Sequence, residues 1–424
     1  MRNNRLVLTK IPAPRNELEP ARRPQLAADP EVLAAAADDF GHLIHHVPAA
    51  VARPRTGGEV AEVMRAAAAD GLVVRARGAG HSVHGQGQCD GGIVCDLTGL
   101  DSVGTIGREQ VTAGAGTRWS TLLTACLAHG LTPPVLTDYL ELTVGGTLSA
   151  GGIGGASHQY GPQVDHVRQL HVVTPAGKMI TCSAQSHPHV FDSALAAQGQ
   201  GGIITEATIP LGPAPRQARV FTIRLPSLAT LLACQRRLAR ESRFGHLQGR
   251  VAIGESGHWD YVLELACFHQ GRPPRDTALL EGLYHDRVQV DAEDVDYVTF
   301  CNRMAPGVRL LASTGDWYRP HPWLSVFLPG NQVERYVSTA LASLTPENLG
   351  PLPMLLYPLR RGTHPASGLA TPPADQDGLF WSFSILRSVD GTRAAINAAL
   401  AGNQVLASAA VEAGGTVYRI SAVP

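Results

Sequence analysis

The chain has 424 residues, 44% of them hydrophobic and 17% charged, a composition that excludes a disordered or fibrous protein. Its 35 basic and 36 acidic side chains leave a net charge of −1, so no basic field is present to hold a nucleic acid or an anionic membrane. No apolar run reaches the roughly 18 residues of a membrane span. Seven scattered cysteines, an odd number, and the lack of a signal-peptide core indicate reduced thiols in a cytoplasmic protein.

The first half of the chain alternates predicted helices with predicted strands. Residues 1–50 form a polar, proline-rich lead that contains an alanine-rich helix near 30–40. The stretch 57–71 has apolar residues at helical spacing and a glycine at its end, which predicts a helix. Similar patterns predict a second helix at 118–130, strands at 72–77, 92–97, 109–116 and 201–211, and a hairpin over 170–182.

The second half has a different character, because aromatic residues replace glycines in its predicted strands. The segment 211–219 is the best linker candidate, since Pro213 and Pro215 interrupt any regular element. We therefore predict a lead (1–50), a glycine-rich α+β domain (51–213) and an aromatic-rich α+β domain (214–424). The predicted elements beyond the linker are a helix at 227–241, strands at 259–268, 324–329, 354–359 and 379–386, and one or two helices over 392–415.

The first motif with chemical potential is the loop RGAGHSVHGQ (77–86), directly after a predicted strand. Its glycines and small polar residues permit backbone N–H groups to approach an anion closely. The spacing fits neither a Rossmann fingerprint, nor a P-loop, nor a nucleophile elbow. Two interpretations stay open: a phosphate-cradling loop with a histidine in its middle, and a tight loop with an incidental surface histidine.

The second motif is the stretch TDYLELTVGGTLSAGGIGG (137–155). Seven glycines fall within 145–161, mixed with hydroxyl side chains, so the loop could wrap a pyrophosphate with backbone donors and without positive charge. The alternative is a glycine-rich array of turns with a purely structural use.

Asp138 opens this second motif, between the apolar stretch 131–136 and a Tyr-Leu pair. Partial removal from water would suit its carboxylate to general-base work. The alternative is an ordinary turn or cap aspartate. The 17 histidines include several close pairs, but none combines with a carboxylate or cysteine at a recognised ligand spacing, so we expect no metal site.

Together these segments resemble the FAD-linked oxidases of the vanillyl-alcohol-oxidase type, in particular the cytokinin dehydrogenases. The resemblance runs from about residue 53 to about residue 418 and implies a PCMH-type FAD-binding domain followed by an α+β substrate-binding domain, an antiparallel sheet flanked by helices. The matching stretches include RARGAGHSVHGQ (75–86), TDYLELTVGGTLSAGGI (137–153), QGQGGIITEATIPLGPAP (198–215) and HPWLSVFLP (321–329).

The resemblance also implies roles for individual residues. His81 matches the histidine that the family bonds through a ring nitrogen to the 8α-methyl group of FAD. Asp138 matches the active-site aspartate that hydrogen-bonds the substrate amine. The implied further contacts with FAD are Gly78, Ala79, Gly80, Ser82, Gln86, Thr143, Gly145, Gly146, Ser149, Ile153 and Ile203.

Two departures from the family pattern concern the substrate pocket. The family's DYVE-type segment carries a substrate-contacting glutamate, whereas this chain has Thr299 at that position. We expect Thr299 and the aromatic Trp381 to contact the substrate. The chain also ends soon after Tyr418, where family members usually continue with a segment that returns to the FAD domain, and this implies a more open pocket.

We therefore expect an FAD-dependent oxidoreductase that removes a hydride from a C–H bond beside N or O of a small molecule. The resemblance and the change at Thr299 point to a secondary metabolite or an N6-substituted purine as the substrate, and to dioxygen or a quinone as the electron acceptor. The alternative is a flavin-containing protein that binds or sequesters a small aromatic compound without turnover. Neither a nucleic acid nor a membrane is expected as a partner.

Overall fold

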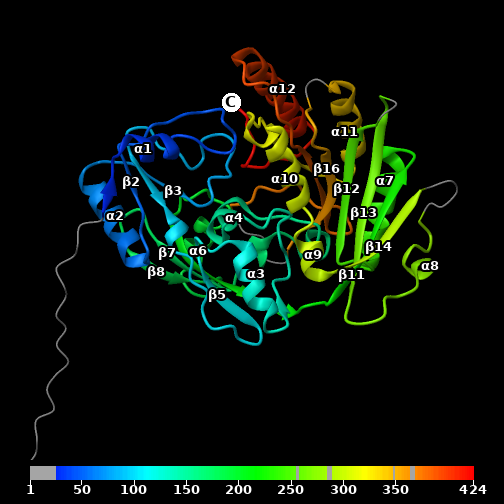
Figure 1. The fold of residues 1–424 in the computed structure, drawn as a ribbon, viewed down its shortest axis with the longest axis horizontal. Helices are drawn as coiled ribbons and strands as arrows, with labels where there is room; N and C mark the ends of the chain where they lie inside the picture. Colours follow the sequence, from blue (N-terminus) through cyan, green and yellow to red (C-terminus); the bar gives the residue numbers. More distant parts are fainter. Residues whose placement is uncertain (1–24, 255–256, 284–288, 347–348, 363–367) are drawn as a thin grey trace, which may run out of the picture.

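The computed structural model describes residues 25–254, 257–283, 289–346, 349–362 and 368–424; residues 1–24 of the predicted lead lie outside this set. Two structural regions lie side by side in Figure 1. Smaller sheets built from the first half of the chain lie on the left, and a large sheet built from the second half lies on the right.

The first small sheet has the strand order β1-β2-β4-β3, in which β4 runs parallel to both β2 and β3. Helix α2 covers it with the apolar face that the sequence predicts, and the Thr56 side chain caps the helix by accepting from the Glu59 N–H. The elements are β1 (Leu26–Ala27), α1 (Pro30–Ala36), β2 (Ala50–Ala52), α2 (Gly57–Ala69), β3 (Val74–Arg77), β4 (Ile93–Asp96) and the 3-10 turn η1 (Leu97–Gly99).

The second small sheet is antiparallel, in the order β5-β9-β7-β8. It packs on a core around the fully buried Trp119, whose indole N–H donates to Thr147. The elements of this part of the chain are β5 (Gln110–Gly114), α3 (Trp119–Leu127), β6 (Leu131–Thr132), α4 (Val144–Ala150), α5 (Ser157–Tyr160), η2 (Gln163–His166), β7 (Gln169–Val173), β8 (Met179–Cys182), α6 (Pro188–Ala194) and β9 (Ile203–Pro210), of which β6 lies outside the sheet.

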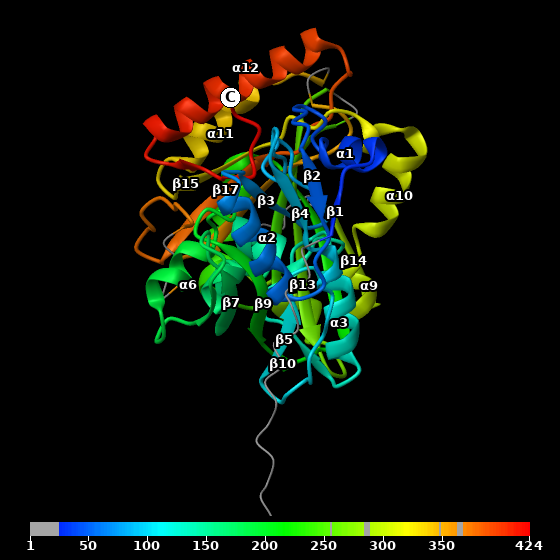
Figure 2. The ribbon, with the colours of Figure 1, turned by 90° about the vertical axis from the view of Figure 1, so that its left-hand side faces the viewer.

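The large sheet has eight antiparallel strands in the order β14-β11-β13-β12-β16-β17-β15-β18. Figure 2 shows α12 and α11 together on the side of the molecule away from β5 and β10. The strands are β11 (Gln217–Leu225), β12 (His246–Ile253), β13 (Trp259–His269), β14 (Val290–Asp296), β15 (Leu324–Pro329), β16 (Met354–Arg360), β17 (Leu379–Ile385) and β18 (Thr416–Val417).

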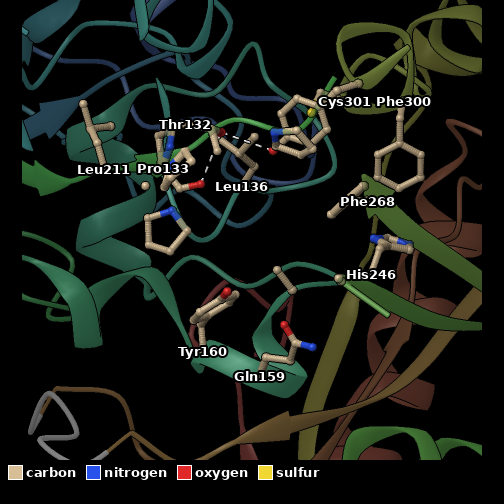
Figure 3. A pocket seen from close by; sticks show the side chains of 18 of the residues that line it. Thr132, Pro133, Leu136, Gln159, Tyr160, Leu211, His246, Phe268, Phe300 and Cys301 are labelled. Carbon is tan, nitrogen blue, oxygen red and sulfur yellow. Dashed lines mark hydrogen bonds between the residues drawn. The ribbon is translucent and has the colours of Figure 1, made fainter. Parts of the chain in front are cut away.

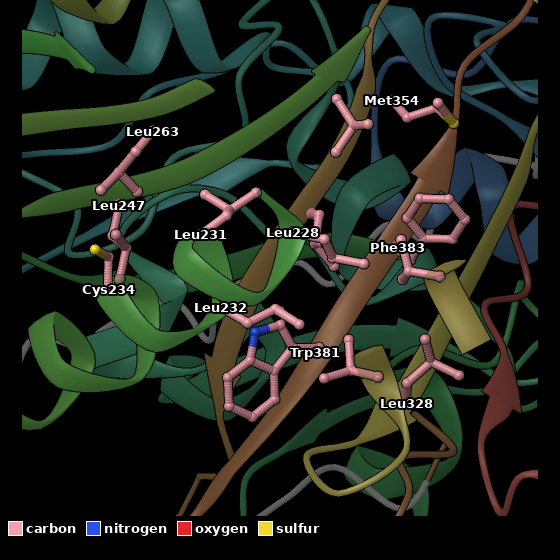
Figure 4. Close-up of a cluster of buried hydrophobic side chains, with 14 of the residues drawn as sticks. Leu228, Leu231, Leu232, Cys234, Leu247, Leu263, Leu328, Met354, Trp381 and Phe383 are labelled. Atoms are coloured by element: carbon pink, nitrogen blue, oxygen red, sulfur yellow. The ribbon is translucent and has the colours of Figure 1, made fainter. Parts of the chain in front are cut away.

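One face of this sheet forms a hydrophobic core with helices α7, α11 and α12 (Figure 4). Because side chains alternate across a strand, the other face carries a different set of residues, which turn toward the first half of the chain. On β12, for example, Leu247 and Val251 belong to the core, whereas His246 and Gln248 do not. The helices are α7 (Leu228–Glu241), α8 (Asp276–Leu279), α9 (Tyr297–Cys301), α10 (Ala305–Thr314), η3 (Asp316–Tyr318), α11 (Val333–Ala342) and α12 (Arg393–Glu412).

The predicted α+β class with an antiparallel second sheet is confirmed, and so are the predicted helices and strands named above. The linker prediction is only partly right: β10 (Gly212–Pro213) pairs with β6, and β11 already begins at Gln217. The large sheet thus begins just beyond residue 213, while the predicted domain limits themselves stay a prediction. The closing segment is one helix, α12. Its length and composition alone would allow it to cross a membrane, but here its buried Asn403 bonds to the backbone of Pro322 and Ala422.

Candidate active site

The first glycine loop leaves β3 at Arg77 and turns sharply twice. Gly80 and Gly85 have φ values of +70° and +75°, a backbone conformation that side chains disfavour. The loop is anchored through its carbonyls, since Gly80 O accepts from Phe40 N and Ser82 O accepts from Gly41 N. The buried Asp39 carboxylate adds bonds from the Ser82 hydroxyl and the Gly85 N–H, although burial raises the pKa of Asp39.

The N–H groups of this loop are available to a ligand. From Gly78 to Val83, none of the six backbone N–H groups donates a hydrogen bond to any residue that the structure describes. Only Val83 of these six residues is buried, so water or a bound ligand can accept from the other N–H groups, and such a run of outward N–H groups on a glycine-rich loop is the arrangement that binds anions. This geometry fits the diphosphate of FAD and favours the ligand-binding interpretation of the loop over the incidental one.

The second glycine loop meets the first but differs in its donors. A β-carbon on Gly78 would lie 2.2 Å from the Thr143 hydroxyl oxygen, so the two loops touch. The N–H groups of Val144, Gly145 and Gly146 donate to Thr117 O, Ala115 O and the Thr143 hydroxyl. At these positions the backbone donors bond within the protein, which favours the structural interpretation of the loop, while the predicted FAD contacts of Gly145 and Gly146 stay a prediction. Its glycines instead allow close packing against the strand end at Ala115.

The other residues of the predicted FAD site lie either in the core or at the contact with the end of the chain. Ser149 lies in α4, and Ile153 packs at the edge of the core around Trp119. Ile203 is buried in a small cluster with Val60 and Val173, where its side chain serves the core. Gln86 donates to the carbonyl of Arg419, and Gly152 N–H donates to the hydroxyl of Tyr418. Residues 418–419 therefore contact both glycine loops. These contacts cover the loops on that side, whereas we expected a more open pocket there.

His81 lies in a group of aromatic rings. Its imidazole stacks on Phe40 with ring centres 4.0 Å apart, and Tyr139, Trp317 and Trp323 lie within 6 Å of its ring centre. Burial, with a contribution from His321, lowers the pKa of His81 to about 3. The ring is therefore neutral at physiological pH, and a neutral imidazole has the free lone pair that a bond to the flavin would need.

Asp138 lies on the loop between β6 and α4 and is held from the large sheet. Its Oδ2 accepts from Gln248 Nε2 at 2.6 Å, and its Oδ1 accepts from Arg303 Nη2 at 2.5 Å. Both charged side chains, Asp138 and Arg303, remain 21% exposed. Asp138 is therefore an ion-paired carboxylate with a fixed orientation. It is more than a turn residue, and it is not isolated from water.

The ion pair continues into a charged cluster on the inward face of the large sheet. Arg303 Nε lies 3.4 Å from Glu264, and Arg250 also lies 3.4 Å from it. Burial alone would raise the pKa of Glu264, but His246 and the two arginines outweigh it and lower the pKa to about 2. Burial and Arg303 lower the pKa of His246, whose Nε2 lies 3.4 Å from a Glu264 carboxylate oxygen, a long contact without good hydrogen-bond geometry. We did not predict this cluster from the sequence.

A cavity of about 600 Å³ adjoins Asp138 and Arg303, between the first half of the chain and the large sheet. Figure 3 shows His246, Phe268 and Phe300 on one side of it, and Gln159 and Tyr160 on α5 on another. Its remaining border includes Pro133, Pro213 and Pro215, so most of the wall is apolar or aromatic. Such a wall with a few convergent polar groups is typical of a small-molecule site.

The two predicted substrate contacts are not at this cavity. Thr299 is exposed, and its hydroxyl bonds to Asp296, which caps α9. Trp381 is fully buried in the core of the large sheet, where its N–H donates to Gln235 (Figure 4). Phe300 and Arg303, close to Thr299 in the chain, border the cavity instead. Among the described residues, no group of three or more histidine, cysteine, aspartate or glutamate side chains is placed to hold a metal ion.

The sequence matches two family models. Residues 48–183 match an FAD binding domain, and residues 244–418 match the model described as cytokinin dehydrogenase 1, FAD and cytokinin binding. The chain is 40% identical over 395 residues to an uncharacterized oxidoreductase in the fasciation locus of Rhodococcoides fascians, covering 92% of this chain and 89% of that protein.

A plant relative and a solved structure agree with these matches. The chain is 33% identical over 414 residues to cytokinin dehydrogenase 6 of Oryza sativa subsp. japonica, covering 86% of this chain and 78% of that protein. The fold resembles that of chitooligosaccharide oxidase, with a TM-score of 0.72, 18% identity, and coverage of 94% of this chain and 88% of the other. The chain therefore belongs to the cytokinin dehydrogenase family of FAD-dependent oxidoreductases of the vanillyl-alcohol-oxidase type.

Proposed function

We propose that this oxidoreductase removes a hydride from a C–H bond beside an N–H or O–H group of a small molecule, and that Asp138 receives the N–H or O–H proton. The observation that carries the proposal is that the residue expected to bind the substrate and a residue that contacts His81 are neighbours in the chain. Asp138 borders the cavity, and the next residue, Tyr139, contacts the ring of His81. A substrate bonded to Asp138 would thus lie beside the flavin that His81 would hold.

Each residue has a defined part in this scheme. FAD supplies the two-electron acceptor when bound. The N–H groups of Gly78–Val83 would hold its diphosphate, and the neutral His81 imidazole would hold its ring system through a covalent link. Gln248 and Arg303 hold the Asp138 carboxylate in one orientation. An ionised carboxylate has about four lone-pair positions and uses two of them here, so Asp138 can still accept from a substrate.

The cavity supports a small aromatic or partly apolar substrate. Aromatic side chains such as Phe268, Phe300 and Tyr160 suit a flat ring. An N6-substituted purine or a ring-containing secondary metabolite meets this description. Dioxygen or a quinone would then reoxidise the flavin.

An anaerobic screen tests the proposal. Purified protein is mixed with candidate amines and alcohols without oxygen, and bleaching of the flavin absorbance is followed in the wild type and in Asp138→Asn. Positioned proton transfer contributes about 10²- to 10⁴-fold to rates, so we expect Asp138→Asn to slow bleaching by about that factor.

Glu141→Gln is the matched control, because Glu141 lies on the same loop but pairs with Arg118 at the surface. It should bleach at the wild-type rate. If no compound bleaches the flavin, and a small aromatic compound binds tightly without reduction, the protein is a binding or sequestration protein and the enzymatic proposal fails.

A further inference from the structure

Helix α12 has a solvent-facing side that is apolar and uncharged. The helix lies on the outside of the molecule, with α11 beneath it (Figure 2). One side packs on the core of the large sheet through residues such as Leu406 and Ala410. The opposite side faces solvent, where Val405 and Val411 are 68% and 58% exposed. The only charged residues of α12 are its first and its last, so about five turns between them carry no charge.

The neighbouring helix α11 has an ordinary solvent-facing side. Its exposed residues are Glu334, Arg335, Ser338 and Thr339, all of them polar or charged. Such residues are what the outer face of a helix in a soluble protein usually carries. The apolar outer face of α12 is instead typical of a surface that binds a partner.

The spacing of the exposed residues on α12 suits another helix. They recur at alternating intervals of four and three residues, at Ala394, Ala398, Ala401, Val405, Ser408 and Glu412. Two helices pack along positions that repeat every 3.5 residues on average. The intervals are the same when the helix is read backwards, so this face is complementary to itself in an antiparallel pair. Ala401 of one copy would then face the larger Val405 of the other.

The two charges of α12 point to the same arrangement independently of this spacing. Arg393 is at the N-terminal end of the helix and Glu412 is at its C-terminal end. The helix dipole places partial positive charge at the N-terminus and partial negative charge at the C-terminus, so each side chain lies at the end that disfavours it. Both are exposed, and neither side chain has a partner among the residues that the structure describes. In an antiparallel pair, each would lie beside the end of the other helix that favours its charge.

We propose that the exposed face of α12 binds the same face of a second copy of this chain, in an antiparallel helix pair with twofold symmetry. Arg393 of each copy then pairs with Glu412 of the other. A twofold interface uses one patch twice, which fits a face with opposite charges at its two ends. No residue of α12 is among those found to border the cavity beside Asp138, so the inference is independent of the proposed function.

Analytical ultracentrifugation of the purified protein tests the inference. One helix pair is a small interface, so the measurement covers about 1 to 200 µM protein, and we expect the wild type to pass from monomer to dimer within this range. Ala401→Glu should raise the dissociation constant of the dimer by about 100-fold, because two carboxylates would then meet near the twofold axis. Ser338→Glu, on the exposed side of α11, is the matched control and should dimerise as the wild type does.

Charge reversal tests the orientation of the two helices. Arg393→Glu alone and Glu412→Arg alone should each weaken the dimer, because like charges would meet at both ends of an antiparallel pair. An equimolar mixture of the two variants should recover it, since each end contact then joins opposite charges. In a parallel pair, neither single variant would be weakened. Thermal unfolding of each variant separates misfolding from lost pairing.

Four results would overturn the inference. A wild type that stays monomeric up to about 200 µM lacks such an interface, and a dimer that Ala401→Glu leaves intact uses another surface. If the single charge reversals have no effect, or if their mixture recovers nothing, the helices do not pair in the antiparallel orientation. A monomeric wild type that sediments with phosphatidylcholine vesicles, and no longer does so after Ala401→Glu, uses this face to bind a membrane instead.

Discussion

Gly78 and Thr143 are packed so closely that a β-carbon on Gly78 would lie 2.2 Å from the Thr143 hydroxyl oxygen. They belong to different glycine loops, 65 residues apart in the chain. Thr143 also caps α4 by accepting from the Gly146 N–H. This contact therefore sets the position of the loop with free N–H groups relative to the helix that follows Asp138.

Gly78→Ala should lower both stability and flavin content. The added methyl group would displace the Thr143 side chain or the loop, and overpacking of this kind costs about 1–3 kcal/mol. Urea denaturation measures the free energy of unfolding, and the ratio of flavin absorbance to protein absorbance measures cofactor content. Thr143→Ala in the same chain should recover part of the loss, because it removes the oxygen that clashes.

Gly212→Ala is the control for this substitution, since no atom lies within 4 Å of its β-carbon position. It should leave flavin content unchanged. Normal flavin content and stability in Gly78→Ala would show that the loops do not need this contact.

His81→Ala should release the flavin on acid precipitation. Burial lowers the pKa of His81 to about 3, so its ring is neutral and nucleophilic over the physiological range. Wild-type protein precipitated with acid should keep its yellow colour in the pellet, whereas the variant should lose the colour to the supernatant. The test needs no substrate and no turnover.

His84→Ala provides the comparison, because His84 lies three residues further along the same loop and is partly exposed. Its pellet should stay yellow. Colour that leaves the wild-type pellet completely would mean that the flavin is held without a covalent bond.

Local patterns were sufficient to predict much of the fold. Helices α2 and α7 lie within two residues of their predicted ends, because apolar spacing and glycine or serine boundaries are properties of neighbouring residues. The β7–β8 hairpin was predicted for the same reason. Helices α9 and α10 were missed: α9 is short, and no residue of α10 is buried.

The candidate site depends on contacts that no local pattern contains. Asp138 bonds to Gln248 and Arg303 across 110 and 165 residues. One signal was nevertheless present in the sequence: His246, Gln248 and Arg250 alternate along a strand whose intervening residues are small or apolar. Polar residues at every second position indicate a strand face turned away from its core, toward water or a site. Trp381 instead lies in the core of the large sheet, because an aromatic residue in a buried strand is more often a core residue than a ligand contact.

Glu264→Gln should destabilise the protein in a manner that depends on pH. The charged cluster lowers the pKa of Glu264 from 4.5 to about 2, so folding favours its ionised form. The resulting stability is fully present above pH 4.5 and is lost as the pH falls toward 2. A shift of this size corresponds to about 2–4 kcal/mol at neutral pH.

The measurement is urea denaturation of wild type and Glu264→Gln between pH 3 and pH 8. The difference in the free energy of unfolding should be largest above pH 5 and should shrink at the acid end. Glu241→Gln is the surface comparison: Glu241 pairs with Arg237 and Arg243 near the end of α7, and surface ion pairs contribute only about 0–1 kcal/mol, so its effect should be small at every pH. A difference between wild type and Glu264→Gln that is constant with pH would mean that the ionised carboxylate is not what stabilises the fold.

Trp381→Phe separates a core role from a substrate role. The Trp381 ring is fully buried in the core of the large sheet, near Leu232 (Figure 4). The guanidinium of Arg236 lies over it, 4.9 Å from the ring centre. Replacement by phenylalanine removes the bond to Gln235 and leaves a void, so the free energy of unfolding should fall by about 1–3 kcal/mol. The dissociation constant of any compound that bleaches the flavin should stay within twofold of the wild-type value, because no atom of the cavity wall is changed. A large rise in that constant at unchanged stability would place Trp381 at the substrate after all, and the cavity beside Asp138 would then be too narrow a description of the binding site.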